Sequence, residues 1–154
     1  MIKSYYKVES NEKIAKSVYK MVLSGDTSAI TRPGQFINIK VPDKYLRRPI
    51  SVCDFDGETV TVIYKVVGEG TKIMSEMEKG ISLDVLTGLG NGFDIEKSGD
   101  RPLLIGGGVG VPPLYNLAEK LKAEGKTVTV ILGFNTSDEV FLKEEFEKIA
   151  TVYL

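Results

Sequence analysis

Residues 103–114 read Leu-Leu-Ile-Gly-Gly-Gly-Val-Gly-Val-Pro-Pro-Leu. Three apolar residues run into four glycines within five positions, and two prolines follow. This order is typical of a strand, a tight turn and a helix that begins at a proline, because the first helical turn needs no proline N–H. Free N–H groups at such a helix start can bind a phosphate. The spacing is not G-x-G-x-x-G, since Val111 stands where the third glycine would be, so a nucleotide site and a purely structural turn both stay open.

The composition around this stretch is that of an ordinary globular protein. The 154 residues are 42% hydrophobic and 27% charged, and the formal net charge is −1. A balanced charge does not favour nucleic acid or an anionic membrane as a partner. No apolar run approaches the roughly 18 residues of a membrane span. Residues 1–5 show no secretory signal pattern, so we expect a cytoplasmic protein.

Two residue types are absent or scarce. The chain has no histidine, which excludes histidine-based acid–base catalysis, Ser-His-Asp triads and imidazole metal sites. Its one cysteine, Cys53, excludes internal disulfides and any zinc or iron–sulfur site made by this chain alone. We expect Cys53 to be a small core residue. The sequence therefore predicts no catalytic side chain and no metal ligands, but a site that relies on a bound cofactor.

Residues 1–98 are predicted to form an antiparallel β-barrel or sandwich of short strands. β-branched and aromatic residues gather in four segments separated by turn residues, at 17–23, 36–41, 59–67 and 81–86. Asp56-Gly57 is a hairpin signal. Thr71 is expected to cap a short helix that ends at Gly80, with three apolar residues on one side, Ile73, Met74 and Met77.

Residues 99–154 alternate strands with helices. Strands are predicted at 103–105, 127–134 and 151–154, and a helix is predicted at 112–124. Ser137 is expected to cap a second helix, with Asp138 and Glu139 in its first turn as capping residues that complement the helix dipole and three residues facing inward, Leu142, Phe146 and Ile149. This order implies a parallel sheet with right-handed crossovers. Because doubly wound sheets have more strands, we expect the N-terminal half of an α/β nucleotide domain. The uncovered edge at 103–105 favours a homodimer or local disorder.

Three further motifs could contact a ligand. Arg47-Arg48-Pro49-Ile50-Ser51 lies at the edge of a predicted strand, directly after a loop, and offers guanidinium forks suited to a pyrophosphate. Gly68-Glu69-Gly70-Thr71 and Gly88-Leu89-Gly90-Asn91-Gly92-Phe93 offer backbone N–H groups. Each also has an ordinary explanation, as a solvated basic turn, a flexible turn before a helix, or the connection between two lobes. Considered one by one, these residues leave both explanations open.

Taken in order along the chain, four motifs resemble the ferredoxin–NADP reductase superfamily: Pro33-Gly34-Gln35-Phe36, Arg48-Pro49-Ile50-Ser51, Gly70-Thr71 and Gly106-Gly107-Gly108-Val109-Gly110. Members of that superfamily pair a flavin-binding β-barrel with a nicotinamide-binding α/β domain. Within it, the fuller motifs look most like the electron-transfer subunits of dihydroorotate dehydrogenase B. The resemblance spans nearly the whole chain and implies a barrel over 1–98 followed by a partial nicotinamide domain over 99–154.

The resemblance implies FAD and NADH as ligands. Arg48 would contact the FAD pyrophosphate, and Ser51 would lie near the reactive edge of the flavin, with Pro49 and Ile50 between them. The isoalloxazine and ribityl region would be lined by Ile63, Tyr64 and Lys65, where Lys65 replaces the family's usual arginine. Gly70 and Thr71 would bind the FAD phosphates. Room for NADH would come from Gly107, Gly108 and Gly110, with Gly133-Phe134 beside it.

The implied reaction is hydride transfer from NADH to FAD, followed by one-electron steps. In the family, electrons leave through a [2Fe–2S] cluster held by four C-terminal cysteines and reach FMN in a catalytic subunit that oxidises dihydroorotate to orotate in pyrimidine biosynthesis. This chain lacks those cysteines, so we expect a truncated chain that binds FAD but has no cluster of its own. Residues 135–138 contain no Arg or Lys for a 2′-phosphate, which favours NADH. Two alternatives stay open: the small subunit of an NADH-dependent ferredoxin:NADP oxidoreductase or sulfide dehydrogenase, and a catalytically silent FAD-binding fragment.

Overall fold

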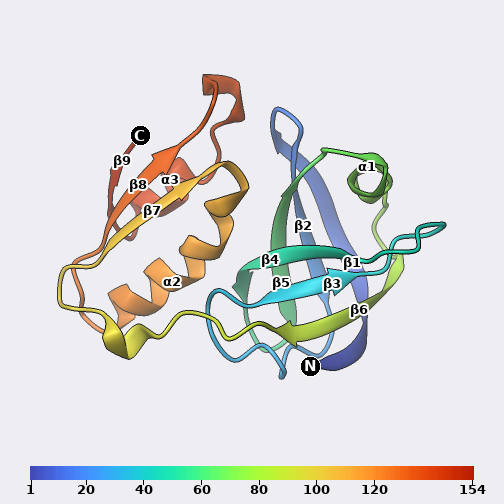
Figure 1. The fold of residues 1–154 in the computed structure, drawn as a ribbon, viewed down its shortest axis with the longest axis horizontal. Coiled ribbons are helices and arrows are strands. Elements are labelled where there is room, and N and C mark those ends of the chain that lie inside the picture. Colours follow the sequence, from blue (N-terminus) through green and yellow to red (C-terminus); the bar gives the residue numbers. More distant parts are fainter.

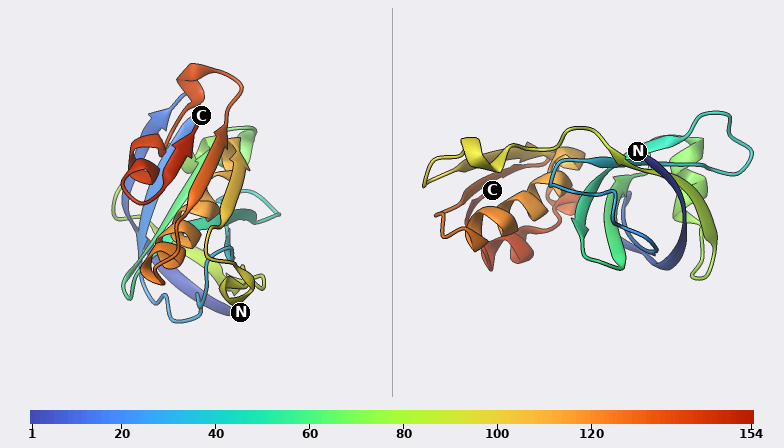
Figure 2. Two further views of the ribbon diagram at one scale, coloured as in Figure 1. Left: turned by 90° about the vertical axis from the view of Figure 1, so that its left-hand side faces the viewer. Right: turned by 90° about the horizontal axis from the view of Figure 1, so that it is seen from below.

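The computed structural model describes all residues, 1–154, and has two parts side by side (Figures 1 and 2). The first part is a closed barrel of six strands in the order β1-β2-β5-β4-β3-β6, with every neighbouring pair antiparallel. Its elements are β1 (Ile2–Ala15), β2 (Val18–Ser24), β3 (Phe36–Ile39), β4 (Arg48–Phe55), β5 (Thr59–Lys65), α1 (Glu69–Ser75) and β6 (Ser82–Leu89). The predicted antiparallel barrel is confirmed.

The second part is a parallel sheet in the order β7-β8-β9 with helices on one side. Its elements are β7 (Leu103–Gly107), α2 (Pro112–Ala123), β8 (Thr129–Gly133), α3 (Lys143–Glu147) and β9 (Thr151–Tyr153). Short 3-10 turns lie at Ile95–Lys97, Gly108–Gly110 and Ser137–Glu139. The predicted strand–helix alternation is confirmed, while the division after residue 98 stays a prediction. None of the helices is long and apolar enough to cross a membrane.

The barrel closes around side chains that alternate along its strands, as half-buried strands require. They include Tyr6, Val8, Met21, Leu23, Ile37, Ile39, Val60, Val62 and Val85. Strand β1 was not predicted, because Lys, Ser, Glu and Asn interrupt its apolar residues. Its first half pairs with β6 and its second half with β2. Pairing along both halves of β1 therefore outweighs the weak β propensity of its sequence.

The short helix α1 differs from its prediction at both ends. It begins at Glu69, and the residue before it is Gly68, so the prediction that Thr71 caps the helix is wrong. The Thr71 hydroxyl lies inside the first turn and accepts from the N–H groups of Val67 and Gly68 at 2.9 and 3.2 Å. The helix ends at Ser75, so Met77 lies beyond it, yet Met77 is still buried in the barrel core.

The helix predicted from Ser137 is wrong as one continuous element. Residues 137–139 form a 3-10 turn, Val140 is extended, and α3 covers only Lys143–Glu147. Leu142 interrupts the helix, because it adopts a left-handed backbone conformation with φ of +62°. This break lets Phe141 and Leu142 reach the core together with Phe146. By contrast, α2 begins at Pro112 as predicted, and Gly125 with φ of +81° follows its end.

Helix α2 lies between the barrel and the parallel sheet (Figure 1). Its residues Leu114, Leu117, Ala118 and Leu121 belong to one buried cluster with the barrel residues Val18, Cys53 and Ile63. Cys53 is 2% exposed, which confirms its prediction as a core residue. A continuous apolar cluster therefore joins the two parts and sets how they face each other.

Candidate functional site

A pocket of about 310 Å³ lies where the barrel meets the glycine-rich turn. Strands β4 and β5 supply most of it because they are neighbours in the barrel, although α1 and the turn also contribute. Its lining residues are Arg48, Pro49, Ile50, Ser51, Ile63, Tyr64, Lys65, Val67, Thr71 and Val109. We call this the first pocket. It brings together eight of the nine residues predicted to contact FAD, and the ninth, Gly70, lies against Arg48.

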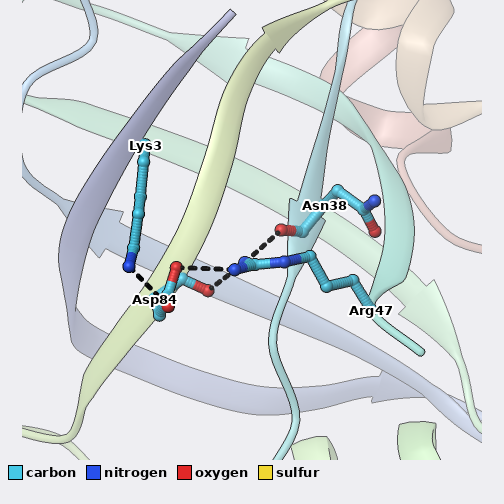
Figure 3. Close-up of polar contacts among 4 residues, drawn as sticks. All are labelled: Lys3, Asn38, Arg47 and Asp84. Carbon is cyan, nitrogen blue, oxygen red and sulfur yellow. Dashed lines mark hydrogen bonds and ion pairs between the residues drawn. The ribbon is translucent and has the colours of Figure 1, made fainter. Parts of the chain in front are cut away.

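The two arginines at the start of β4 point to different places. Arg47 turns toward β6, where its Nη2 lies 3.0 Å from the Asp84 carboxylate (Figure 3). Its Nη1 donates to the carbonyls of Asp84 and Asn38 at 3.1 and 3.4 Å. Burial would raise the pKa of Asp84, but hydrogen bonds and charges from Arg47 and Lys3 lower it below its usual value. Arg47 therefore fixes the loop before β4, and Arg48 is the guanidinium at the pocket.

Arg48 lies directly on the backbone of the first turn of α1. A Cβ atom added at Gly70 would be 2.2 Å from Arg48 Nε and 2.6 Å from its Cζ. Only a residue without a side chain leaves room for the guanidinium at this distance. Arg48 Nη1 also donates to the Leu46 carbonyl. The structure thus places a permanent positive charge beside the first turn of α1, whose leading N–H groups have no intrahelical partners.

The hydroxyl of Tyr64 is not directed at a ligand. It donates to Asn11 Oδ1 at 2.9 Å inside the barrel, and the ring stacks on Tyr19 with centroids 5.9 Å apart. Tyr64 is 1% exposed, and this burial raises the pKa of its phenol. The Tyr64 hydroxyl is therefore used inside the barrel, and the polar lining residues of the first pocket are Arg48, Ser51, Lys65 and Thr71.

A second pocket, of about 560 Å³, adjoins the first. It is lined by Lys65, Gly107, Gly108, Val109, Gly133, Phe134, Asn135 and Glu139. Lys65 and Val109 line both pockets. Gly107 and Gly133 are paired at the carboxyl ends of β7 and β8, where open α/β sheets bind their ligands. Gly110, also predicted for NADH, lies in the turn before α2 and not among the lining residues of either pocket.

An ion pair stands at the border of the two pockets. Lys65 Nζ lies 2.7 Å from Glu139 Oε1, and their side chains are 32% and 15% exposed. The sequence suggested that Glu139 caps a helix, which is wrong because no α-helix begins there. Its partner is 74 residues away in the chain, so no local pattern could have revealed the pair.

Besides the Lys65–Glu139 ion pair, a hydrogen bond joins the barrel to α2. Asn116 Nδ2 donates to Asp54 Oδ1 at 2.8 Å, and Glu119 lies one turn further along the helix. Burial, followed by the charge of Asp54, raises the pKa of Glu119 to about 7. Sequence reasoning missed this group, because the fold alone brings Asp54 to the surface of α2.

The raised pKa of Glu119 predicts that the stability of the fold depends on pH. Folded Glu119 keeps its proton up to about pH 7, whereas the ordinary glutamate pKa is 4.5. The stabilisation is therefore complete below the lower value and is lost as the pH rises through the higher one. We expect the free energy of unfolding to fall by about 1 kcal/mol between pH 5 and pH 8, a figure reduced for partial exposure. Glu119→Gln should flatten this slope in urea unfolding, and the exposed Glu78→Gln should not. A Glu119→Gln curve parallel to that of the unmodified chain would contradict the assignment.

Comparison with known proteins shows what the chain resembles as a whole. Residues 104–153 match the family model described as the oxidoreductase NAD-binding domain. The chain is 47% identical to the dihydroorotate dehydrogenase B (NAD(+)) electron transfer subunit of Fusobacterium nucleatum and 44% identical to that of Bacillus mycoides. Both matches cover 96% of this chain and 60% of the relative. The chain thus spans about 60% of the length of these curated relatives.

A solved structure gives the same result for the fold. The structure of an NADH-dependent reduced ferredoxin-NADP oxidoreductase superposes with a TM-score of 0.85 at 34% identity. The match covers 96% of this chain and 55% of that chain. The fold is therefore that of the ferredoxin reductases, as the motifs predicted. By sequence and by fold, the chain is similar to the electron transfer subunits of dihydroorotate dehydrogenase B over the part of their length that it spans.

Proposed function

We propose that the chain binds FAD in the first pocket and passes electrons from NADH, bound in the second pocket, to that FAD. The observation that carries this proposal is that Lys65 and Val109 line both pockets. Hydride transfer between two rings depends on closeness and orientation more than on an acid or base. Two adjoining pockets offer that closeness in a chain that has no histidine.

The residues of the first pocket fit FAD. Arg48 offers a charged guanidinium for the pyrophosphate, and Gly70, which has no side chain, leaves room for that guanidinium. Pro49, Ile50 and Val67 give the pocket apolar surface against which a flat ring can pack. When bound, FAD supplies the ability to accept a hydride and release single electrons. The side chains of this chain bind and orient it.

The residues of the second pocket fit a nicotinamide dinucleotide. Gly107 and Gly133 carry no side chains where β7 and β8 end, so a ligand can approach the backbone of both strands. The Phe134 ring lies at the end of β8 and offers an apolar surface. The preference for NADH over NADPH stays a prediction.

We further propose that the electrons pass to a catalytic subunit of dihydroorotate dehydrogenase, in pyrimidine biosynthesis. Support comes from the names of the curated relatives, whose identities exceed that of the ferredoxin-NADP oxidoreductase structure. The described residues do not fit a [2Fe–2S] cluster. Their one cysteine, Cys53, is buried among apolar side chains, and burial raises the pKa of its thiol to about 12. An electron path through such a cluster would need ligands from outside residues 1–154.

A homodimer is a further part of this proposal. Strand β7 lies at an edge of its sheet, and Leu103 and Ile105 on it are 54% and 67% exposed. An unpaired strand edge with apolar side chains can pair with a second copy. Sedimentation at two concentrations tests this, and a monomer at both would exclude it.

Anaerobic addition of NADH to the FAD-loaded chain tests the proposed reaction. We expect the purified chain to be yellow and NADH to bleach it. The Gly107→Val variant should still bind FAD, but NADH should bleach it at least tenfold more slowly, because the valine side chain occupies the second pocket. The variant should fold, since a Cβ at Gly107 would meet only Gly133 O at 3.7 Å.

Two outcomes would contradict the proposal in different ways. A chain that binds no FAD would exclude flavin chemistry in the first pocket. A yellow chain that NADH fails to bleach would support the alternative of a catalytically silent FAD-binding protein.

A further inference from the structure

We propose that Glu139 positions the ammonium group of Lys65 between the two pockets and partly neutralises it, and that it thereby lowers the reduction potential of FAD in the first pocket. This inference rests on the proposed binding of FAD. It assigns to Glu139 a role that acts through Lys65 and not by direct contact with the first pocket, whose lining includes Lys65 but not Glu139.

The Lys65–Glu139 ion pair lies where the two pockets meet. Lys65 is the last residue of β5 and lines both pockets, whereas Glu139 lines only the second. The Glu139 side chain is 15% exposed. The neighbouring pair Lys16–Asp138 is 60% and 58% exposed. Because solvent screens a partly buried pair less, the Lys65–Glu139 interaction has the larger effect on a nearby charge.

The two cations of the first pocket differ in their partners. Arg48 forms no ion pair with a carboxylate, so its full charge is available to an anionic ligand. Lys65 has a carboxylate oxygen 2.7 Å from its Nζ. The positive field that Lys65 directs into the pocket is therefore offset by Glu139, while that of Arg48 is not.

The turn that carries Glu139 is held in place independently of Lys65. The Asp138 carbonyl accepts from the Lys16 backbone N–H at 2.9 Å, and the Asp138 carboxylate pairs with Lys16 Nζ at 3.5 Å. Both contacts attach residues 137–139 to the barrel. Removing the charge of Glu139 should consequently leave the turn where it is and free the ammonium of Lys65.

The electrostatic consequence has a definite sign. Reduced flavin carries more negative charge than oxidised flavin, so a positive charge beside it favours the reduced form. A carboxylate next to that positive charge opposes the effect. Glu139→Gln keeps the size of the side chain and removes its charge, and should raise the reduction potential of the bound FAD.

The test is the midpoint potential of FAD in the purified, FAD-loaded chain. For Glu139→Gln we expect the preference for reduced over oxidised flavin to rise about tenfold, a shift of about 30 mV for a two-electron couple. In the Glu139→Asp variant, which keeps the carboxylate, the midpoint potential of the bound FAD should stay close to that of the unmodified chain. The matched control is Asp138→Asn, which removes the adjacent ion pair of the same turn but faces neither pocket. It should leave the potential unchanged.

The outcomes separate this inference from the proposed function. If Glu139→Gln binds FAD and its potential equals that of the unmodified chain, the inference is wrong and FAD binding stands. If Asp138→Asn shifts the potential as much as Glu139→Gln does, the effect is structural, and the inference is also wrong. If the unmodified chain binds no FAD, both the inference and the proposed function are wrong.

Discussion

Replacing Gly70 with alanine is expected to weaken FAD binding by about 10- to 100-fold while the fold stays intact. The new Cβ would lie 2.2 Å from Arg48 Nε. The guanidinium is the far end of a flexible side chain, so it moves away while the helix stays in place. Loss of its charge-assisted hydrogen bonds to the pyrophosphate costs about 1.5–3 kcal/mol, or about 10- to 100-fold in affinity.

The matched control for this variant is Gly68→Ala in the same segment. A Cβ at Gly68 meets nothing within 4 Å, and the extended backbone of Gly68 suits any residue. Titration of FAD into each protein, followed by quenching of the flavin fluorescence, gives the affinities. Thermal unfolding should show that both variants fold, since alanine is a better helix former than glycine at Gly70, inside α1, and a Cβ at Gly68 has room. If Gly70→Ala binds FAD as tightly as Gly68→Ala, the contact between Arg48 and α1 has no part in the site.

Phe146→Ala is expected to lower the free energy of unfolding by about 3–5 kcal/mol, because it leaves a cavity in a packed core. Phe146 is fully buried, and its ring meets Tyr115 edge to face with centroids 5.4 Å apart. It anchors the short helix α3, which has only five residues of its own. A helix of that length depends on packing for its stability.

Urea unfolding measures this loss, with Tyr45→Ala as the control. Tyr45 is an aromatic residue of similar size that is 100% exposed, so its removal should change the stability by less than about 0.5 kcal/mol. A loss below about 1 kcal/mol for Phe146→Ala would mean that α3 is not anchored as the structure shows.

Local chemistry was enough to predict some elements of the fold. The glycines and prolines at 106–113 marked the turn and the start of α2, because few other residues suit those positions. Strand β1 was not predicted, since its pairing partners lie elsewhere in the chain. The break before α3 was not predicted either, because it depends on the burial of Phe141 and Leu142, which a periodic pattern does not reveal.

The candidate site was predicted from a resemblance, because each of its motifs taken alone has an ordinary structural explanation. Arg48–Ser51 and Gly70-Thr71 form short motifs, and their resemblance to a known family indicated one ligand for both. That Thr71 lines one pocket with Arg48–Ser51, and that Gly70 lies against Arg48, follows from the barrel order, which places β4 beside β5, and from α1 coming next after β5 in the chain. The contacts Lys65–Glu139 and Asp54–Asn116 join residues 74 and 62 positions apart. Such contacts exist only once the two parts pack together.

The central claim is that FAD binds in the first pocket, at the border of the two parts. Backbone hydrogen exchange, measured with and without saturating FAD, tests it most directly. We predict added protection in the segments 48–51, 63–65 and 68–71, with little change in β1, β2 and α3. Protection confined to other segments, or none at saturating FAD, would contradict it.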